Sequence, residues 1–188
     1  MRLQLPDFAR GPGQPVNLPA NTGGGMPPTL VSDGTLFDVA FRLVVDPKSL
    51  SLNEIRRGVD LPLDAELLVT PVAGLPGSFD VRVRRAAALP AGNLKLLSLF
   101  GDVLTDAALG RVSLLELQAV TMNGTAAPAA ADAAPHAVAY LGDLNLDARY
   151  DSTDVNLMGR LGSNQSFSKR GMSLERPDLG DARSVDSL

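Results

Sequence analysis

Alternation of apolar and polar side chains with a period of two is the feature that most limits the fold of this 188-residue chain. In residues 37–45 every odd position is apolar, whereas Asp38 and Arg42 lie at even positions. Residues 79–84 repeat the pattern, with charged side chains between apolar ones. Because successive side chains of a strand point to opposite faces, this spacing predicts strands with one buried face.

Further apolar runs follow the same plan, and short breaks rich in Gly, Pro or Asp separate them. Such breaks form tight turns, and the Asp residues, 17 of 21 acidic ones, disfavour long helices. We therefore predict a mainly β chain in which residues 1–123 form an antiparallel β-sandwich or jelly roll. The additional strands are expected at residues 14–18 and 50–55 and, more fully buried, at 65–72, 94–100 and 112–120.

Residues 124–136 differ from everything before them, since the stretch consists mostly of Ala and Pro. Side chains this small bury little apolar surface, and the composition is typical of a linker. Residues 137–188 are polar and rich in Asp. The sequence thus predicts a sandwich, an Ala/Pro linker and a small C-terminal module with these boundaries.

Composition excludes several classes of function. The chain carries 17 basic and 21 acidic residues, whereas a nucleic-acid surface needs clustered Lys and Arg. The absence of Cys excludes disulfides, thiolate metal sites and Cys nucleophiles. No apolar run approaches the roughly 20 residues of a membrane span. The single histidine, His136, has no Ser or Asp partner signalled beside it, and we interpret it as a surface residue.

Acidic residues concentrate in one stretch, residues 143–154. If Asp143 is position 1, oxygen-bearing side chains also stand at positions 3, 5, 9 and 12, the ligand positions of an EF-hand-type calcium loop. Position 7 of such a loop supplies its backbone carbonyl, so an arginine is tolerated there. The sequence predicts a calcium site and no catalytic residue. The expected ligands are Asp143, Asn145, Asp147, Arg149 through its carbonyl, Asp151 and Asp154.

An acidic turn without an ion is the alternative for this stretch. Against it, four carboxylates so close in sequence repel one another unless a cation lies among them. Position 6, commonly Gly, is Ala148, and a left-handed backbone there costs roughly 1 kcal/mol. The loop should lead into a helix over residues 152–161, in which Val155, Met158 and Leu161 form an apolar stripe.

The segment 140–161, a calcium-type loop with an exiting helix but no entering one, resembles the first repeat of a type I dockerin. The resemblance implies that Ser152, Thr153 and Arg160 contact a protein partner, since dockerins meet cohesins in this region. Dockerins carry a second repeat. Residues 178–188 resemble a damaged copy with Gly and Ala at two ligand positions, so we expect no strong second calcium site.

The predicted sandwich, which precedes the dockerin-like segment in the chain, resembles a cohesin. This resemblance involves fewer matching positions than the resemblance to a dockerin. The resembling stretches are residues 11–19, 41–50, 92–97 and 107–110. The resemblance implies a jelly-roll fold and an extracellular or cell-surface location, because cohesins and dockerins assemble polysaccharide-degrading enzymes outside the cell. It also implies that this chain is a fragment of a longer secreted protein.

We therefore expect a non-catalytic module that binds calcium and mediates protein–protein assembly or carbohydrate binding linked to polysaccharide breakdown. Its partner would be a cohesin-like or dockerin-like module, in another chain or in this one, and a polysaccharide is a further candidate. Two alternatives stay open: a purely structural adhesion stalk, and an accessory part of a secreted glycoside hydrolase. For the second, no motif marks a pair of carboxylates, and Glu54 and Glu116 lie in predicted strands. We interpret Arg56, Arg57, Arg82, Arg84 and Arg85 as residues on the solvent-exposed faces of strands.

Overall fold

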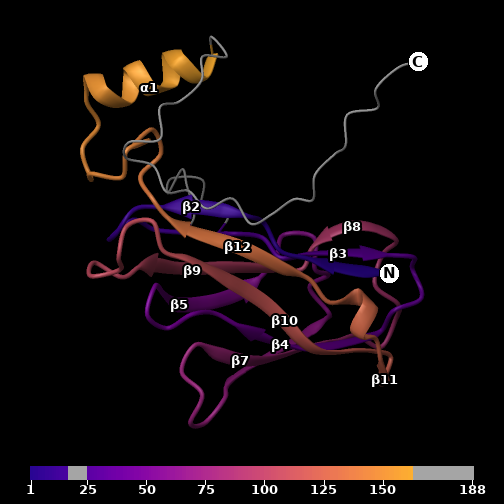
Figure 1. Ribbon diagram of the computed structural model, residues 1–188. Helices are drawn as coiled ribbons and strands as arrows, with labels where there is room; N and C mark the ends of the chain where they lie inside the picture. Colours follow the sequence, from indigo (N-terminus) through magenta and orange to yellow (C-terminus); the bar gives the residue numbers. More distant parts are fainter. Residues whose placement is uncertain (17–24, 163–188) are drawn as a thin grey trace, which may run out of the picture.

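In the computed structural model, which describes residues 1–16 and 25–162, the chain forms two layers of β-strands with a short helix beside them (Figure 1). The larger layer is a seven-stranded sheet with the order β2–β12–β10–β4–β7–β6, and β11 pairs with the end of β10. All neighbours are antiparallel except β2 and β12, which run parallel. The strands are β2 (Phe8–Arg10), β4 (Asp38–Val44), β6 (Glu66–Pro71), β7 (Ser78–Arg84), β10 (Val112–Met122), β11 (Thr125–Ala126) and β12 (Ala133–Val138).

The smaller layer consists of two hydrogen-bonded groups, β1–β3–β8 and β5–β9. Only Leu96 separates β8 from β9, and Met26 bridges to Leu99, so the two groups continue into one another. The strands are β1 (Arg2–Gln4), β3 (Thr29–Ser32), β5 (Leu50–Arg57), β8 (Gly92–Lys95) and β9 (Leu97–Val103).

One apolar core lies between the layers and is built from alternate side chains of the strands. In β4, Val39 and Leu43 are fully buried, as the period of two predicts, whereas Phe37 before the strand is half-exposed. Leu97 and Leu99 of β9 are also fully buried. Each such side chain contributes about 1.5–3 kcal/mol through burial. The predicted mainly β sandwich is confirmed.

Strand β6 corrects one detail of the sequence analysis. The apolar run 65–72 forms a strand, but this strand lies at the edge of the large sheet and is not fully buried. Leu68, in its middle, is 56% exposed. An apolar run indicates a strand without revealing whether another strand covers it.

The predicted linker, residues 124–136, is wrong because the stretch belongs to the sandwich. Thr125–Ala126 forms β11, Pro128–Ala130 forms a short 3-10 turn, and the remainder begins β12. β12 pairs with β10 on one side and with β2 on the other. Ala130 and Ala134 are buried, because small side chains fit where the two layers approach closely. The sandwich therefore extends to the end of β12.

Helix α1 (Ser152–Gly162) is the only α-helix in the described residues and stands off the sandwich beyond the end of β12 (Figure 1). Its bounds agree with the helix expected at 152–161. Across the described parts of the chain, no helix is long and apolar enough to cross a membrane. Residues 178–188, the expected second repeat, lie outside the described residues, and the module predicted at 137–188 stays a prediction.

Candidate functional site

The aspartate loop, residues 143–154, is organised around two buried carboxylates. Asp143 is 4% exposed and Asp154 is fully buried. The two carboxylate oxygens of Asp143 accept hydrogen bonds from the backbone N–H groups of Asp147 (3.1 Å) and Ala148 (2.9 Å). Because these bonds join residues four and five apart, they fold the loop back on its first aspartate.

Asp154 closes the other end of the loop. Its Oδ1 accepts the N–H of Leu144 at 2.8 Å, and its Oδ2 accepts the N–H of Asp151 at 3.0 Å. Oδ1 of Asp151 accepts the N–H of Thr153 at 2.7 Å, so both aspartates cap the first turn of α1. The backbone N–H groups of Asp151, Leu144 and Asn145 hold the pKa of Asp154 below its usual range, and the carboxylate stays charged.

The backbone of the loop turns through two left-handed residues, Leu146 (φ 60°) and Ala148 (φ 65°). The sequence predicts this conformation for Ala148 at position 6, and the structure confirms it. Asp147, between them, accepts hydrogen bonds from the N–H of Arg149 and the side-chain amide of Asn145, both at 2.9 Å. The loop thus holds two non-glycine residues in a left-handed conformation, against their local preference.

The oxygen atoms of the expected ligands suit a hard cation, although the side chains do not converge on a single position in this structure. Each oxygen of Asp143 accepts one N–H bond and keeps a second lone pair for a cation. All the expected ligands offer oxygen, the atom that calcium prefers. Among the residues that the structure describes, no three His, Asp or Glu side chains converge as a closed metal site requires. A cation would have to draw the exposed Asp147 and Asp151 toward the two buried aspartates.

The loop is seated on one end of the sandwich. The Tyr140 hydroxyl donates a hydrogen bond to the Pro12 carbonyl (3.1 Å), and its ring occupies the space where a Cβ on Gly11 would lie. Leu146 packs beside Gly110, with its Cδ1 atom 3.3 Å from the place of a Cβ there. The sequence left open whether the two modules touch, and these contacts show that the loop and the sandwich do.

The expected partner-contact residues lie along α1. The side chains of Ser152 and Thr153 are exposed at the start of the helix, whereas the side chain of Arg160 lies outside the described part of the chain. Val155 and Met158 are 56% and 47% exposed, so the apolar stripe does not pack on the sandwich. Partner binding by this helix stays a prediction.

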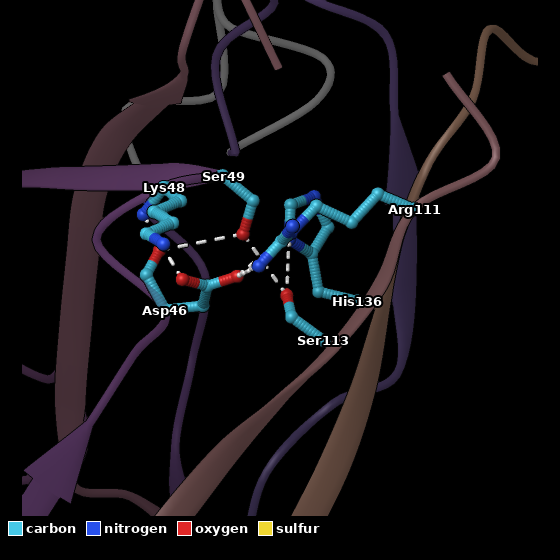
Figure 2. A network of polar contacts seen from close by, with 6 residues as sticks. All are labelled: Asp46, Lys48, Ser49, Arg111, Ser113 and His136. Carbon is cyan, nitrogen blue, oxygen red and sulfur yellow. Dashed lines mark hydrogen bonds and ion pairs between the residues drawn. The ribbon is translucent and has the colours of Figure 1, made fainter. Parts of the chain in front are cut away.

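A polar network that the sequence did not reveal lies beside β12 (Figure 2). His136 is fully buried there and stacks on Phe8, with ring centroids 4.5 Å apart. Its Nδ1 lies 3.5 Å from Oγ of Ser113, which lies 3.0 Å from Oγ of Ser49. The Ser49 hydroxyl in turn donates to the carbonyl of Asp46 at 3.3 Å. The surface interpretation of the histidine was wrong, because its Ala-rich neighbours hid the alternation of a strand.

The backbone carbonyl of Asp46, at one end of this network, determines which group donates in each hydrogen bond. A backbone carbonyl only accepts, so Ser49 uses its one hydroxyl proton on Asp46. Ser113 must then donate to Ser49, and the Nδ1–H of His136 must donate to Ser113. Neutral His136 therefore leaves Nε2 as an acceptor, which has no partner among the described residues. A second proton would place a buried, charged donor on that atom.

The fold is expected to lose stability in weakly acidic solution. Burial lowers the pKa of His136, with Asp46 acting in the opposite direction and Arg10 acting with it. The unfolded chain takes up the proton near pH 6.5 and the folded chain only at lower pH, so the free energy of unfolding falls as the pH drops from about 7.5 toward the folded-state pKa. Urea denaturation at a series of pH values measures this dependence.

The control for that experiment is His136→Gln, which cannot titrate but retains an N–H donor for Ser113. Its free energy of unfolding should be flat over the same pH range, even if it is lower throughout. A variant with the same slope as the wild type would show that other groups cause the loss.

The outer face of the large sheet carries a shallow hollow of about 280 Å³ over β10, β4, β7 and β6. Two bidentate ion pairs flank it, Arg42 with Asp80 (2.8 and 3.1 Å) and Arg82 with Asp38 (2.9 and 2.6 Å). Hydrogen bonds from these arginines lower the pKa of both aspartates, so the pairs stay ionised. Leu68 contributes exposed apolar surface between them. An apolar centre with a polar rim is typical of protein-docking surfaces.

Sequence comparisons find no relative, since no protein-family model and no curated protein matches the chain. Solved structures do match. The sixth cohesin of scaffoldin B from Acetivibrio cellulolyticus, solved in complex with a Cel5 dockerin, aligns over 73% of this chain and 97% of its own, with 13% identity and a TM-score of 0.56. A non-cellulosomal cohesin from Archaeoglobus fulgidus aligns over 75% and 94%, with 10% identity and a TM-score of 0.55. The cohesin module of a Clostridium perfringens family 33 glycoside hydrolase aligns over 73% and 95%, with 9% identity and a TM-score of 0.52.

The sandwich has the cohesin fold. This finding confirms the resemblance that a few short stretches of sequence suggested, and it concerns the arrangement of the strands, because identities near 10% carry no residue roles. The dockerin-like repeat beside the cohesin-like sandwich stays a prediction.

The two glutamates expected in strands lie in different layers of the cohesin-like sandwich, Glu54 in β5 and Glu116 in β10. Hydrogen bonds from Arg56 lower the pKa of Glu54, whereas a general acid needs a raised one. Glu116 accepts a hydrogen bond from the side chain of Gln118 at 2.6 Å. Neither glutamate has the surroundings of a glycosidase acid.

Proposed function

We propose that this protein is a non-catalytic docking module of an extracellular assembly, in which the cohesin-like sandwich binds a protein partner and the aspartate loop binds calcium. The observation that carries the proposal is the cohesin fold of the sandwich. The similar structures include cohesins solved in complex with a dockerin. A dockerin-like module is therefore the partner that we propose.

The outer face of β10, β4, β7 and β6 is the surface that we assign to this partner. Its central strands are paired on both sides, which keeps the face rigid. The charges that flank the hollow are paired, Arg42 with Asp80 and Arg82 with Asp38, so a partner can cover the hollow without burying a lone charge there. The apolar surface of Leu68 and Ala40 between the pairs would supply the hydrophobic contact.

Calcium would bind in the aspartate loop and let its carboxylates come together. The two buried aspartates and the left-handed turn support this proposal, as does a donor set made only of oxygen. The ion would be held by the carbonyl of Arg149 and by the side chains of Asp143, Asn145, Asp147, Asp151 and Asp154. Ser152, Thr153 and Arg160 would then offer a second contact surface on α1, toward a cohesin-like partner.

A second candidate function is an accessory module of a secreted glycoside hydrolase. It is favoured by the similarity to a cohesin module that belongs to such an enzyme in Clostridium perfringens. In that case the sandwich would hold the enzyme to another protein or to its polysaccharide. A glycan array probed with the full chain separates these cases, because only polysaccharide attachment predicts binding there.

Replacement of Ala40 by Arg is expected to weaken partner binding at least tenfold, which corresponds to about 1.4 kcal/mol. Ala40 lines the hollow on the outer face, and a long charged side chain there would hold the partner away. Biolayer interferometry with the immobilised full chain and a panel of purified, calcium-loaded dockerin modules measures the change.

Val112→Lys is the matched control, since this residue is 65% exposed, pairs with β12 at the end of β10 that β4 does not reach, and does not line the hollow. It should bind like the wild type. If no dockerin in the panel binds the wild type, or if Ala40→Arg binds as tightly, the assigned face is wrong.

A further inference from the structure

The edge of the large sheet formed by β6 has no strand beside it among the described residues. The ladder with β7 determines which of its backbone groups are unpaired. The N–H of Val72 donates to the carbonyl of Ser78 directly opposite (2.9 Å), so even-numbered residues of β6 bond to β7 and odd-numbered ones point outward. Leu67 and Val69 therefore present N–H and C=O groups at the edge. Pro71 ends the series, because it has no N–H.

Strand β6 lacks the features that protect other edges of the sandwich. The outer strand of the small layer, β5, has a bulge between Leu52 and Glu54 and carries the charged Arg56. At the other edge of the large sheet, β2 is only three residues long. β6 has six residues in regular register and one charged side chain, Glu66. Regular edge strands with few charges pair readily with another strand.

Two exposed apolar side chains lie on the hairpin that contains this edge. Leu68 in β6 is 56% exposed, and Leu75 in the turn after the strand is 50% exposed. An exposed leucine in the middle of an open edge strand is apolar surface that a second strand would cover.

The backbone of β6 is complementary to itself. If two copies pair antiparallel with Leu68 at the two-fold axis, Leu67 of each copy lies opposite Val69 of the other. Their outward N–H and C=O groups then form about four hydrogen bonds across the axis. Glu66 lies opposite Thr70, so no like charges meet along the pair.

The same axis matches the exposed side chain of the strand. Leu68 is 56% exposed, and the two Leu68 side chains would meet at the axis itself, on the outer face of the joined sheets. Apolar surface would therefore cover apolar surface at the centre of the pair.

We infer that β6 is a dimerisation strand, through which two copies of this chain join their large sheets into one continuous sheet. A second copy is the occupant that the edge favours, because one two-fold register satisfies the outward backbone groups and covers the exposed Leu68 of each copy with that of the other. The inference goes beyond the proposed docking function. A dimer would present two outer faces and so raise the avidity for a partner with repeated modules.

Sedimentation velocity on the full chain, with the variants Leu68→Lys and Leu68→Glu, tests the inference. The wild type should shift from monomer to dimer as its concentration rises. Each variant alone should dimerise at least tenfold more weakly, because like charges then meet at the axis. An equimolar mixture of the two variants should dimerise again, since each axis then holds one Lys and one Glu.

Amide hydrogen exchange provides a second readout and Val112→Lys the control. Exchange at the amides of Leu67 and Val69 should slow as the wild type dimerises, and Val112→Lys should behave like the wild type. A chain that stays monomeric up to about 200 µM would overturn the inference, and so would a mixture no more dimeric than its parts. A monomer that captures an extended peptide along β6 would assign the edge to a different occupant and overturn it too.

Discussion

Calcium is expected to raise the thermal midpoint of the full chain by about 5–10 °C when its free concentration is about 100 times the dissociation constant. Under that condition binding adds about 2.7 kcal/mol to the free energy of unfolding, and a chain of this size gains about 2–4 °C for each kcal/mol. The shift should extend to the sandwich, because Tyr140 and Leu146 join the loop to it. Differential scanning calorimetry in calcium and in EDTA measures the effect.

Asp154→Ala should remove this shift. The variant also loses the backbone hydrogen bonds that Asp154 accepts, so its midpoint in EDTA will be lower, and the informative quantity is the difference between calcium and EDTA for each protein. Asp106→Ala is the matched control, since it removes an exposed aspartate outside the loop. Equal midpoints of the wild type in calcium and in EDTA would contradict the calcium proposal.

Tyr140→Ala is expected to lower the free energy of unfolding by about 2 kcal/mol and to separate the loop from the sandwich. The ring is half-buried over Gly11, and its hydroxyl bonds to the Pro12 carbonyl, so truncation removes both the packing and the hydrogen bond. Calcium should still bind the loop, but it should no longer raise the midpoint of the sandwich. Calorimetry with and without calcium measures both quantities.

Tyr140→Phe is the control for this prediction, because it keeps the ring and loses only the hydrogen bond, at a cost of about 1 kcal/mol. It should retain the calcium-dependent shift. If Tyr140→Ala retains the full shift as well, the loop is coupled to the sandwich by contacts other than this ring.

The strands of the sandwich could be predicted from the sequence where one face of the strand is buried and the other is exposed to solvent. Strands β4 and β7 show that alternation, and their buried faces are the predicted ones. The position of β6 could not be predicted in this way. Its apolar run is the same whether a neighbour covers it or not, and only the order of strands shows that it forms an edge.

Strand β12 was missed because composition concealed its pattern. Ala134, His136 and Val138 are all buried and alternate along the strand, but Pro135 and Ala137 between them continue the Ala/Pro composition of a linker. A histidine within a period-two pattern is the signal that could have revealed both the strand and the polar network. The network itself could not be predicted, since Ser49, Ser113 and His136 are far apart in the sequence.

The aspartate loop was the most predictable part of the site. Its side chains are close in sequence, so spacing alone predicts the turn, the helix that follows it and the left-handed Ala148. The contacts of Tyr140 with Gly11 and of Leu146 with Gly110 join residues that are distant in the chain, so sequence spacing could not reveal them.

Isothermal titration of the chelator-treated full chain with calcium tests most directly whether the aspartate loop of this docking module is a calcium site. We predict that one calcium ion binds per chain, that Asp143→Asn and Asp154→Ala lose this binding, and that Asp106→Ala keeps it. No binding by the wild type up to about 1 mM calcium, or undiminished binding by both loop variants, would contradict the account.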